Sequence, residues 1–273
     1  MTVKLVAIDV DKTLVDDEKQ LHEKVIEAIK AASQREVKVV ICSGRPLPGL
    51  KQILTDLNLA NQKDQYVVCF GGSVVQSTAG EVIMSQGLAY EDYLDLELIA
   101  RKLDLPFHAV SMDRIYTANR DIGYYSMYES NLVNMPLSYR TPAELKEIPL
   151  IKAMFVEEPA KLDQAFAAGR ALFAAKEDRV TFVKSQPFFL EANTKGVDKA
   201  QALTKLCAHL GLDLSQDVMA IGDGGNDLPM IKAAKIGVAM ANALPEVKAA
   251  SDFVTADNNH DGVAVAIEKF ILA

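Results

Sequence analysis

Two pairs of acidic residues in this chain could carry out chemistry on a bound anion. Asp9 and Asp11 lie two residues apart in AIDVDKTL, directly after an apolar run, and Asp223 and Asp227 follow the apolar VMAI. Carboxylates at this spacing can project to one side of a strand end, where one attacks a substrate and the other moves protons. The second pair offers the oxygen ligands that Mg²⁺ prefers. Taken singly, both patterns also occur in ordinary turns and helix caps.

Two further segments carry groups that could bind phosphate. Ser43 and Gly44 follow the apolar VKVVIC, and a hydroxyl beside a glycine lets both side chain and backbone N–H reach a phosphate oxygen. Lys199 begins a predicted helix in KGVDKAQAL, where its charge is slightly unfavourable to the helix dipole. Lys195 is the competing lysine.

The spacing of apolar runs and helical repeats predicts how these segments are positioned. Buried strands are expected in ranges 3–10, 37–41, 67–70, 218–221 and 236–240, and helices in ranges 21–32, 197–210, 229–235 and from 261. Strands that alternate with helices form right-handed βαβ units, so we predict a doubly wound α/β fold with a parallel sheet. Ligands bind beyond the carboxyl ends of such strands, and the four polar segments should converge there.

The alternating rhythm stops in the middle of the chain. A hairpin is expected around Ala79-Gly80, followed by helices over 91–103 and 160–175 among five strand-like pieces. This mixture predicts a smaller α+β domain over residues 83–190, inserted into a core formed by 1–82 and 191–273. Seven of the eight tyrosines lie in the insertion. They indicate either a ligand-facing surface or an aromatic core.

Composition excludes several classes of function. The net charge is -8 and no basic run occurs, which argues against nucleic-acid binding. Three cysteines without a CxxC spacing argue against a disulfide framework and a structural zinc site. No signal peptide or long apolar segment is recognisable, so we expect a cytoplasmic protein without a membrane partner. The oligomeric state stays open.

Five motifs together resemble the haloacid dehalogenase (HAD) superfamily: AIDVDKTL, VVICSGRP, GVDKAQAL, AIGDGGNDLPMI and GVAMANA. The segments YTANRDIGYYSMYES and PFFLEA resemble its Cof-type branch of sugar phosphatases. The resemblance spans nearly the whole chain. It implies a HAD-like, Rossmannoid core with a movable cap domain, and a Mg²⁺-dependent phosphatase that forms an aspartyl-phosphate on a small phosphorylated substrate.

The resemblance also implies a role for each motif residue. Asp9 would be the nucleophile and a Mg²⁺ ligand, and Asp11 the general acid and base, with its backbone carbonyl on the metal. Asp223 would complete the set of protein ligands to the metal. Asp227 would contact these ligands rather than the metal itself. Lys199 would offset the charge of the transferring group. The residues expected to hold the phosphate are Ser43, Gly44, Lys199 and Asn226.

The chain departs from the family pattern at three places. Lys12 stands where glycine is usual, Ala200 replaces the glycine after the motif lysine, and Gly71-Gly72-Ser73 replaces an Asn-Gly-Ala turn. Lys12 adjoins the catalytic carboxylates. We expect it to carry some backbone strain and to point away from the phosphate.

We expect the inserted domain to determine which leaving groups the enzyme accepts. Asn119, Arg120 and Asp121 could hydrogen-bond sugar-like hydroxyls, although they could instead merely hold the cap together. Two other functions remain possible from the sequence. One is a phosphomutase that reuses the aspartyl-phosphate, and the other is a phosphate-binding regulatory protein in which Lys12 marks lost turnover.

Overall fold

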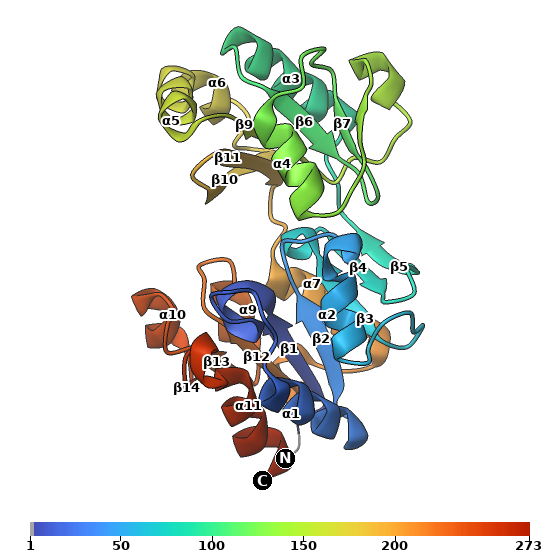
Figure 1. The fold of residues 1–273 in the computed structure, drawn as a ribbon, viewed down its shortest axis with the longest axis vertical. Helices are drawn as coiled ribbons and strands as arrows, with labels where there is room; N and C mark the ends of the chain where they lie inside the picture. The colour runs from blue at the N-terminus through green and yellow to red at the C-terminus, as the bar shows by residue number, and fades with distance from the viewer. Residues whose placement is uncertain (1–2) are drawn as a thin grey trace. The chain divides into compact units, whose positions relative to one another are not determined.

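The computed structural model describes residues 3–273. The chain forms two compact units (Figure 1). The first unit combines Met1–Met84 with Asp198–Ala273, and the second is Ser85–Val197. The predicted boundaries lay at 82/83 and 190/191. The second boundary shifts to 197/198 because β11 (Phe189–Thr194) pairs with a strand of the second unit. In residues 3–273, no helix is long and apolar enough to cross a membrane.

The first unit is built on one eight-stranded sheet in the order β14-β13-β12-β1-β2-β3-β4-β5. Strands β14 through β3 in that order are parallel, and β4 turns back antiparallel to β3. The central strand is buried along its whole length, as its continuous apolar run predicts. The strands are β1 (Leu5–Asp9), β2 (Lys38–Cys42), β3 (Tyr66–Cys69), β4 (Val74–Ser77), β5 (Val82–Ser85), β12 (Val218–Gly222), β13 (Ile236–Ala239) and β14 (Phe253–Val254).

Helices cover both faces of this sheet, which confirms the predicted α/β class. Helices α7 and α9 pack on one face through Leu203, Leu206 and Met230, while α1 and α11 pack together on the other (Figure 1). The helices are α1 (Glu23–Gln34), α2 (Lys51–Asp56), α7 (Lys199–Leu210), α8 (Leu214–Asp217), α9 (Leu228–Ala233), α10 (Pro245–Ala250) and α11 (Gly262–Ile267). The short helices α2, α8 and α10 were not predicted.

The second unit contains a six-stranded sheet in the order β10-β11-β9-β6-β7-β8. All neighbours are antiparallel except β7 and β8. One face packs an apolar core, which includes Phe107 and Phe155, against α3 (Tyr90–Lys102), α5 (Pro159–Ala168) and α6 (Arg170–Ala174). The remaining strands are β6 (Phe107–Val110), β7 (Ile115–Thr117), β8 (Leu137–Tyr139), β9 (Lys152–Val156) and β10 (Val180–Gln186).

Two helices of the second unit differ from prediction. The single helix expected over 160–175 is interrupted at Gly169, whose φ of -87° and ψ of 7° separate α5 from α6. Position 169 has no room for a side chain, because a Cβ there would lie 2.6 Å from Leu103 Cδ1. Helix α4 (Tyr124–Leu132) was not predicted. Its amphipathic pattern is weak, and it is tied to the sheet by a polar contact, the 3.0 Å hydrogen bond between Ser126 Oγ and His108 Nδ1.

Candidate active site

The predicted site residues of the first unit come from neighbouring strand ends. Asp9 is the last residue of β1, Ser43 follows β2, and Asp223 follows β12. These three strands are adjacent and parallel, in the order β12-β1-β2. Their carboxyl ends therefore lie at one edge of the sheet, which is where an open α/β sheet binds its ligand.

Lys199 joins the two acidic segments in the interior. Its Nζ donates to Asp9 Oδ1 at 2.5 Å and to Asp227 Oδ1 at 2.6 Å. The three residues are buried, with exposed fractions of 0% for Lys199, 6% for Asp9 and 1% for Asp227. Burial lowers the pKa of Lys199, but the charges of Asp227 and Asp9 outweigh it and raise the pKa overall. A fixed positive charge therefore lies beside Asp9.

Burial acts in the opposite direction on the carboxyl group of Asp9. It raises the pKa of Asp9 to about 7, and the charge of Asp227 adds to the rise, although Lys199 opposes it. Additional positive charge nearby stabilises the ionised form of a carboxylate that burial makes unfavourable. This is the environment expected for a group that meets a cation or transfers a phosphoryl group.

The helix that carries Lys199 is anchored at its first turn. The N-cap residue Asp198 accepts a hydrogen bond from the backbone N–H of Gln201 at 2.8 Å. Gly72 contacts this turn from the β3–β4 connection. Its φ is +116°, and a Cβ there would lie 2.3 Å from the Asp198 carbonyl oxygen. Glycine at position 72 thus lets the loop pack directly against the start of α7.

The acidic residues could hold a metal ion. Asp9, Asp223 and Asp227 each offer a carboxylate oxygen, and these oxygens lie within 4.8 Å of one another. Asp227 is already engaged through both oxygens, since Oδ2 accepts from the backbone N–H of Asp223 at 3.0 Å and of Gly224 at 2.9 Å. Asp9 and Asp223 therefore remain as ligands, and this all-oxygen donor set fits Mg²⁺. Burial raises the pKa of Asp223 to about 6.

Asp11 lies outside this cluster and has a different partner. Arg45 Nη2 donates to Asp11 Oδ1 at 2.5 Å, and Arg45 Nε donates to Oδ2 at 3.1 Å. Such a two-point contact fixes the orientation of the carboxylate. Arg45 was not among the predicted site residues, although its place directly after Ser43 and Gly44 was a usable signal, because a planar guanidinium suits anion recognition.

The other expected phosphate contacts lie at the same edge of the sheet without direct contact to Lys199. Ser43 is buried, and its Oγ accepts a hydrogen bond from the backbone N–H of Arg45 at 3.1 Å. Gly44 has open space where a Cβ would lie. Asn226 is exposed and makes no hydrogen bond to another described residue. Gly44 and Asn226 are therefore open to a ligand, whereas Ser43 is 1% exposed.

The competing lysine lies in the other unit. Lys195 belongs to the second unit, where its Nζ donates to the Glu177 carbonyl oxygen at 2.5 Å. Lys199 is therefore the lysine that meets the acidic cluster.

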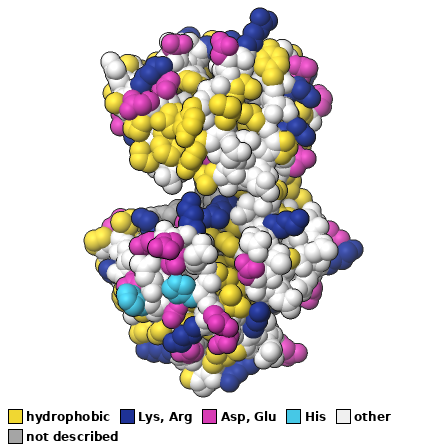
Figure 2. Space-filling view, viewed as in Figure 1, with side chains coloured by type: hydrophobic (Ala, Val, Ile, Leu, Met, Phe, Trp, Pro, Cys, Tyr) yellow, Lys and Arg dark blue, Asp and Glu magenta, His cyan; other side chains and the backbone are white. Residues whose placement is uncertain are grey.

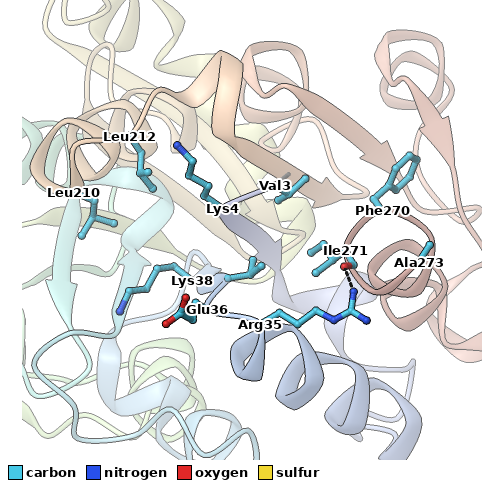
Figure 3. Close-up of a pocket in the computed structure, with 11 residues that line it drawn as sticks. Val3, Lys4, Arg35, Glu36, Lys38, Leu210, Leu212, Phe270, Ile271 and Ala273 are labelled. Carbon is cyan, nitrogen blue, oxygen red and sulfur yellow. Dashed lines mark hydrogen bonds between the residues drawn. The ribbon is translucent and has the colours of Figure 1, made fainter. Parts of the chain in front are cut away.

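A groove of about 670 Å³ also opens on the first unit, at the opposite edge of the sheet (Figure 3). Lys4, Lys38 and Arg35 line it, but their head groups are engaged. Lys4 pairs with Asp217 at 3.0 Å, Lys38 donates to the Asp64 carbonyl at 2.9 Å, and Arg35 donates to the Ile271 carbonyl at 2.8 Å. The five residues of β1 separate this groove from Asp9 by about 15 Å, so it is not part of the acidic site.

The three candidate substrate residues of the second unit differ in their surroundings. Asn119 Oδ1 accepts hydrogen bonds from the Phe107 backbone N–H at 3.1 Å and from Thr117 Oγ1 at 3.0 Å. It therefore holds the loop in place. Arg120 and Asp121 are exposed, with no hydrogen bond or ion pair to any described residue.

The tyrosines of the second unit divide between the two expected settings. Tyr93 is buried and stacks on Phe107 in the core. Tyr125 and Tyr128 of α4 instead pack against Phe188. Their ring centroids lie 5.0 Å and 5.5 Å, respectively, from the ring centroid of Phe188. Hydrophobic side chains collect on this visible face of the second unit (Figure 2).

Comparisons with known proteins agree with the motifs and the fold. The family model for haloacid dehalogenase-like hydrolases matches residues 6–267. A provisionally named phosphatase of Streptococcus pyogenes is 43% identical over 273 residues, covering 100% of both chains. A haloacid dehalogenase-like hydrolase of Bacteroides thetaiotaomicron has a TM-score of 0.86 at 30% identity, covering 98% of this chain and 99% of that one. A HAD subclass IIB sugar phosphatase has a TM-score of 0.76 at 25% identity, covering 98% of each chain. The chain therefore belongs to the haloacid dehalogenase-like hydrolase family and is an enzyme of the Cof-type phosphatase branch of that family.

Proposed function

We propose that this enzyme is a Mg²⁺-dependent phosphatase that hydrolyses small phosphorylated metabolites, preferably sugar phosphates, through an aspartyl-phosphate on Asp9. One observation carries the proposal. Lys199 holds Asp9 and Asp227 in a buried site, and Asp223 offers a further oxygen within 4.8 Å. This arrangement provides a nucleophile, a fixed positive charge and a cation site around one point.

In the first half of the reaction, Asp9 attacks the phosphorus atom with the oxygen that Lys199 does not bind. The bond between phosphorus and the leaving oxygen breaks, and Asp11 donates a proton to that oxygen. Lys199, Ser43 and the backbone N–H of Gly44 stabilise the phosphoryl oxygens. Mg²⁺ held by Asp9, Asp223 and the Asp11 carbonyl would neutralise phosphoryl charge and orient the group.

In the second half, Asp11 accepts a proton from a water molecule. The water oxygen attacks phosphorus, the bond between phosphorus and Asp9 breaks, and inorganic phosphate leaves. Asp9 returns as a free carboxylate, still paired with Lys199. The two halves require that Asp11 first gives and then takes one proton, so its orientation matters in both.

The substrate class rests on two supports. One solved relative is a HAD subclass IIB sugar phosphatase with the same fold over 98% of this chain. The second unit offers exposed Arg120, Asp121 and an aromatic surface, which suit an alcohol with several hydroxyls. We place the enzyme in the cytoplasm, where such metabolites are found.

Removal and return of Mg²⁺ tests the cofactor. Exhaustive chelation should stop steady release of phosphate from an aryl phosphate, and added Mg²⁺ should restore it. Unchanged turnover after chelation would refute the metal assignment. Steady phosphate release also separates a phosphatase from a phosphomutase and from a phosphate-binding protein.

Two substitutions test the division of roles between the carboxylates. Asp9→Asn should abolish turnover at any Mg²⁺ concentration, because an amide cannot act as the nucleophile. Asp223→Asn should act mainly through metal affinity, and high Mg²⁺ should partly restore it. Equal losses in both variants, neither restored by Mg²⁺, would contradict this assignment.

A further inference from the structure

Asn242 links parts of the first unit that are far apart in the sequence. Its Nδ2 donates to the Lys12 carbonyl oxygen at 2.8 Å, and its Oδ1 accepts from the backbone N–H of Asn258 at 3.2 Å. The two partners fix the orientation of the amide, because a carbonyl only accepts and an N–H only donates. Asn242 belongs to the motif GVAMANA, which takes no part in the chemistry proposed above.

The carbonyl that Asn242 holds belongs to a strained turn. Asp11 has φ -73° and ψ 124°, and Lys12 has φ 63° and ψ 14°. These angles are those of the two central residues of a type II turn, whose second central position favours glycine. Lysine carries a Cβ, so the left-handed backbone at position 12 is unfavourable unless surrounding contacts hold it.

The turn is held on both sides of Asp11. On one side, Asp9 ends the buried strand β1. On the other side, Asn242 holds the carbonyl oxygen of Lys12, and the next residue, Thr13, is buried. Lys12 can leave the left-handed region only if the peptide groups beside it rotate, and the bond from Asn242 restrains one of these two groups. Loss of that bond would therefore give the backbone at Asp11 more freedom.

We propose that Asn242 is a positioning residue, which keeps the turn at Lys12 left-handed and thereby holds Asp11 where it can protonate the leaving oxygen. The inference rests on the proposed function, because Asp11 moves a proton only in that reaction. Arg45 orients the carboxylate of Asp11 directly. Asn242 acts instead on the backbone to which that side chain is attached, and it need not touch the substrate.

The test compares kcat/KM for glycerol phosphate and for para-nitrophenyl phosphate. An alkoxide needs a proton as it departs, whereas nitrophenolate leaves as an anion. Asn242→Ala should lower kcat/KM roughly 5- to 50-fold for glycerol phosphate and about twofold or less for para-nitrophenyl phosphate. Asn242→Asp should have the same effect, because a carboxylate still accepts from Asn258 but cannot donate to Lys12.

The chain provides a matched control at Asn259. Like Asn242, it is exposed and its amide makes two hydrogen bonds, which here join it to the Asp17 backbone N–H at 3.1 Å and to Asp17 Oδ2 at 3.0 Å. These bonds hold the loop beyond the turn. Asn259→Ala should therefore keep the ratio of the two kcat/KM values within about twofold of the parent. Melting midpoints of both variants show whether their effects on stability are alike.

Lys12→Gly tests the link to backbone strain. Glycine adopts the left-handed turn readily, so the Asn242 amide should matter less in that background. The loss that Asn242→Ala causes on glycerol phosphate should shrink to about threefold or less when Lys12→Gly is present. A merely structural role for Asn242 would give the same loss in both backgrounds.

Three outcomes would overturn the inference. If Asn242→Ala lowers kcat/KM equally for both substrates, or leaves both unchanged, Asn242 does not position Asp11. If the full loss on glycerol phosphate persists with Lys12→Gly, the strained turn is not what Asn242 holds. If the parent releases no phosphate from either substrate, the proposed function itself fails and the inference fails with it.

Discussion

Arg45 donates to both carboxylate oxygens of Asp11, the residue proposed to move the proton. The side chain of Asp11 is 54% exposed, so without such a partner it could take several orientations. A guanidinium fork restricts it to one, and Arg45 itself follows Ser43 in the same turn. We therefore regard Arg45 as a positioning residue for proton transfer.

Arg45→Met should slow turnover most for those substrates whose leaving oxygen must be protonated as it departs. We expect kcat/KM to fall roughly 10- to 100-fold for an alkyl phosphate. An aryl phosphate, whose leaving group departs as an anion, should lose about fivefold or less. Arg35→Met, at the opposite edge of the sheet, serves as the control. Equal losses on both substrates would show that Arg45 instead binds the phosphate.

At the scale of elements, the connection between β3 and β4 positions the helix that carries Lys199. Gly71 and Gly72 both have positive φ, but only Gly72 is crowded, because a Cβ there would lie 2.3 Å from the Asp198 carbonyl oxygen. At Gly71 nothing lies within 4 Å of a Cβ. The two glycines are thus retained for different reasons.

Gly72→Ala should lower both stability and activity. We expect a loss of about 1–3 kcal/mol in the free energy of unfolding, because either the loop or the start of α7 must shift. The shift would move Lys199 relative to Asp9 and lower kcat. Gly71→Asn is the matched control, since asparagine tolerates a left-handed backbone. Denaturant midpoints and kcat for the two variants check this, and equal effects would contradict it.

The second unit contains a buried histidine whose titration opposes folding in acid. His108 is fully buried, and burial together with the charge of Lys152 lowers its pKa to about 3. An unfolded histidine has a pKa of about 6.5. Below that pH the unfolded chain binds a proton that folded His108 does not, so its contribution destabilises the fold as pH falls from about 6.5 to 3.

His108→Asn should remove this pH dependence. Between pH 7.5 and 5, the parent should lose about 2 kcal/mol more of its free energy of unfolding than the variant loses. Urea unfolding followed by a probe in the second unit measures both. His260→Asn is the control, because that histidine is exposed on the first unit. A variant with the same acid sensitivity as the parent would refute the assignment.

For the whole molecule, the two units suggest a division of labour. All the residues proposed for the chemistry lie in the first unit, and none of them determines which alcohol is released. The second unit presents Arg120 on its surface with no ion pair to a described residue. We therefore predict that Arg120 contributes to the choice of leaving group.

Arg120→Ala should lower kcat/KM for the best physiological substrate more than for an aryl phosphate, by about 5- to 150-fold, since each lost polar contact costs roughly 1–3 kcal/mol. Arg170→Ala, on α6 of the same unit, should leave the ratio unchanged. A parallel fall on both substrates, together with a lower melting midpoint, would mean that Arg120 only supports the fold.

The sequence by itself determined the features that depend on local pattern. The continuous apolar run before Asp9 predicted a strand buried on both faces, and the structure confirms it. The α/β class followed from alternation of such runs with helical repeats, because neighbouring residues suffice to set both periods. The expected meeting place of Asp9, Ser43 and Asp223 followed from a general property of parallel sheets.

The tertiary structure decided what depends on residues far apart in the chain. Asp11 and Arg45 are 34 positions apart, and no local pattern pairs them. Asn119 was one of three tentative substrate contacts, and its amide oxygen accepts a hydrogen bond from the backbone N–H of Phe107, twelve positions away. Helix α4 has a weak amphipathic pattern, and it contacts the sheet through the hydrogen bond between Ser126 and His108. Such contacts form only when strands and helices pack, because packing brings distant polar groups together and removes the water that would otherwise satisfy them.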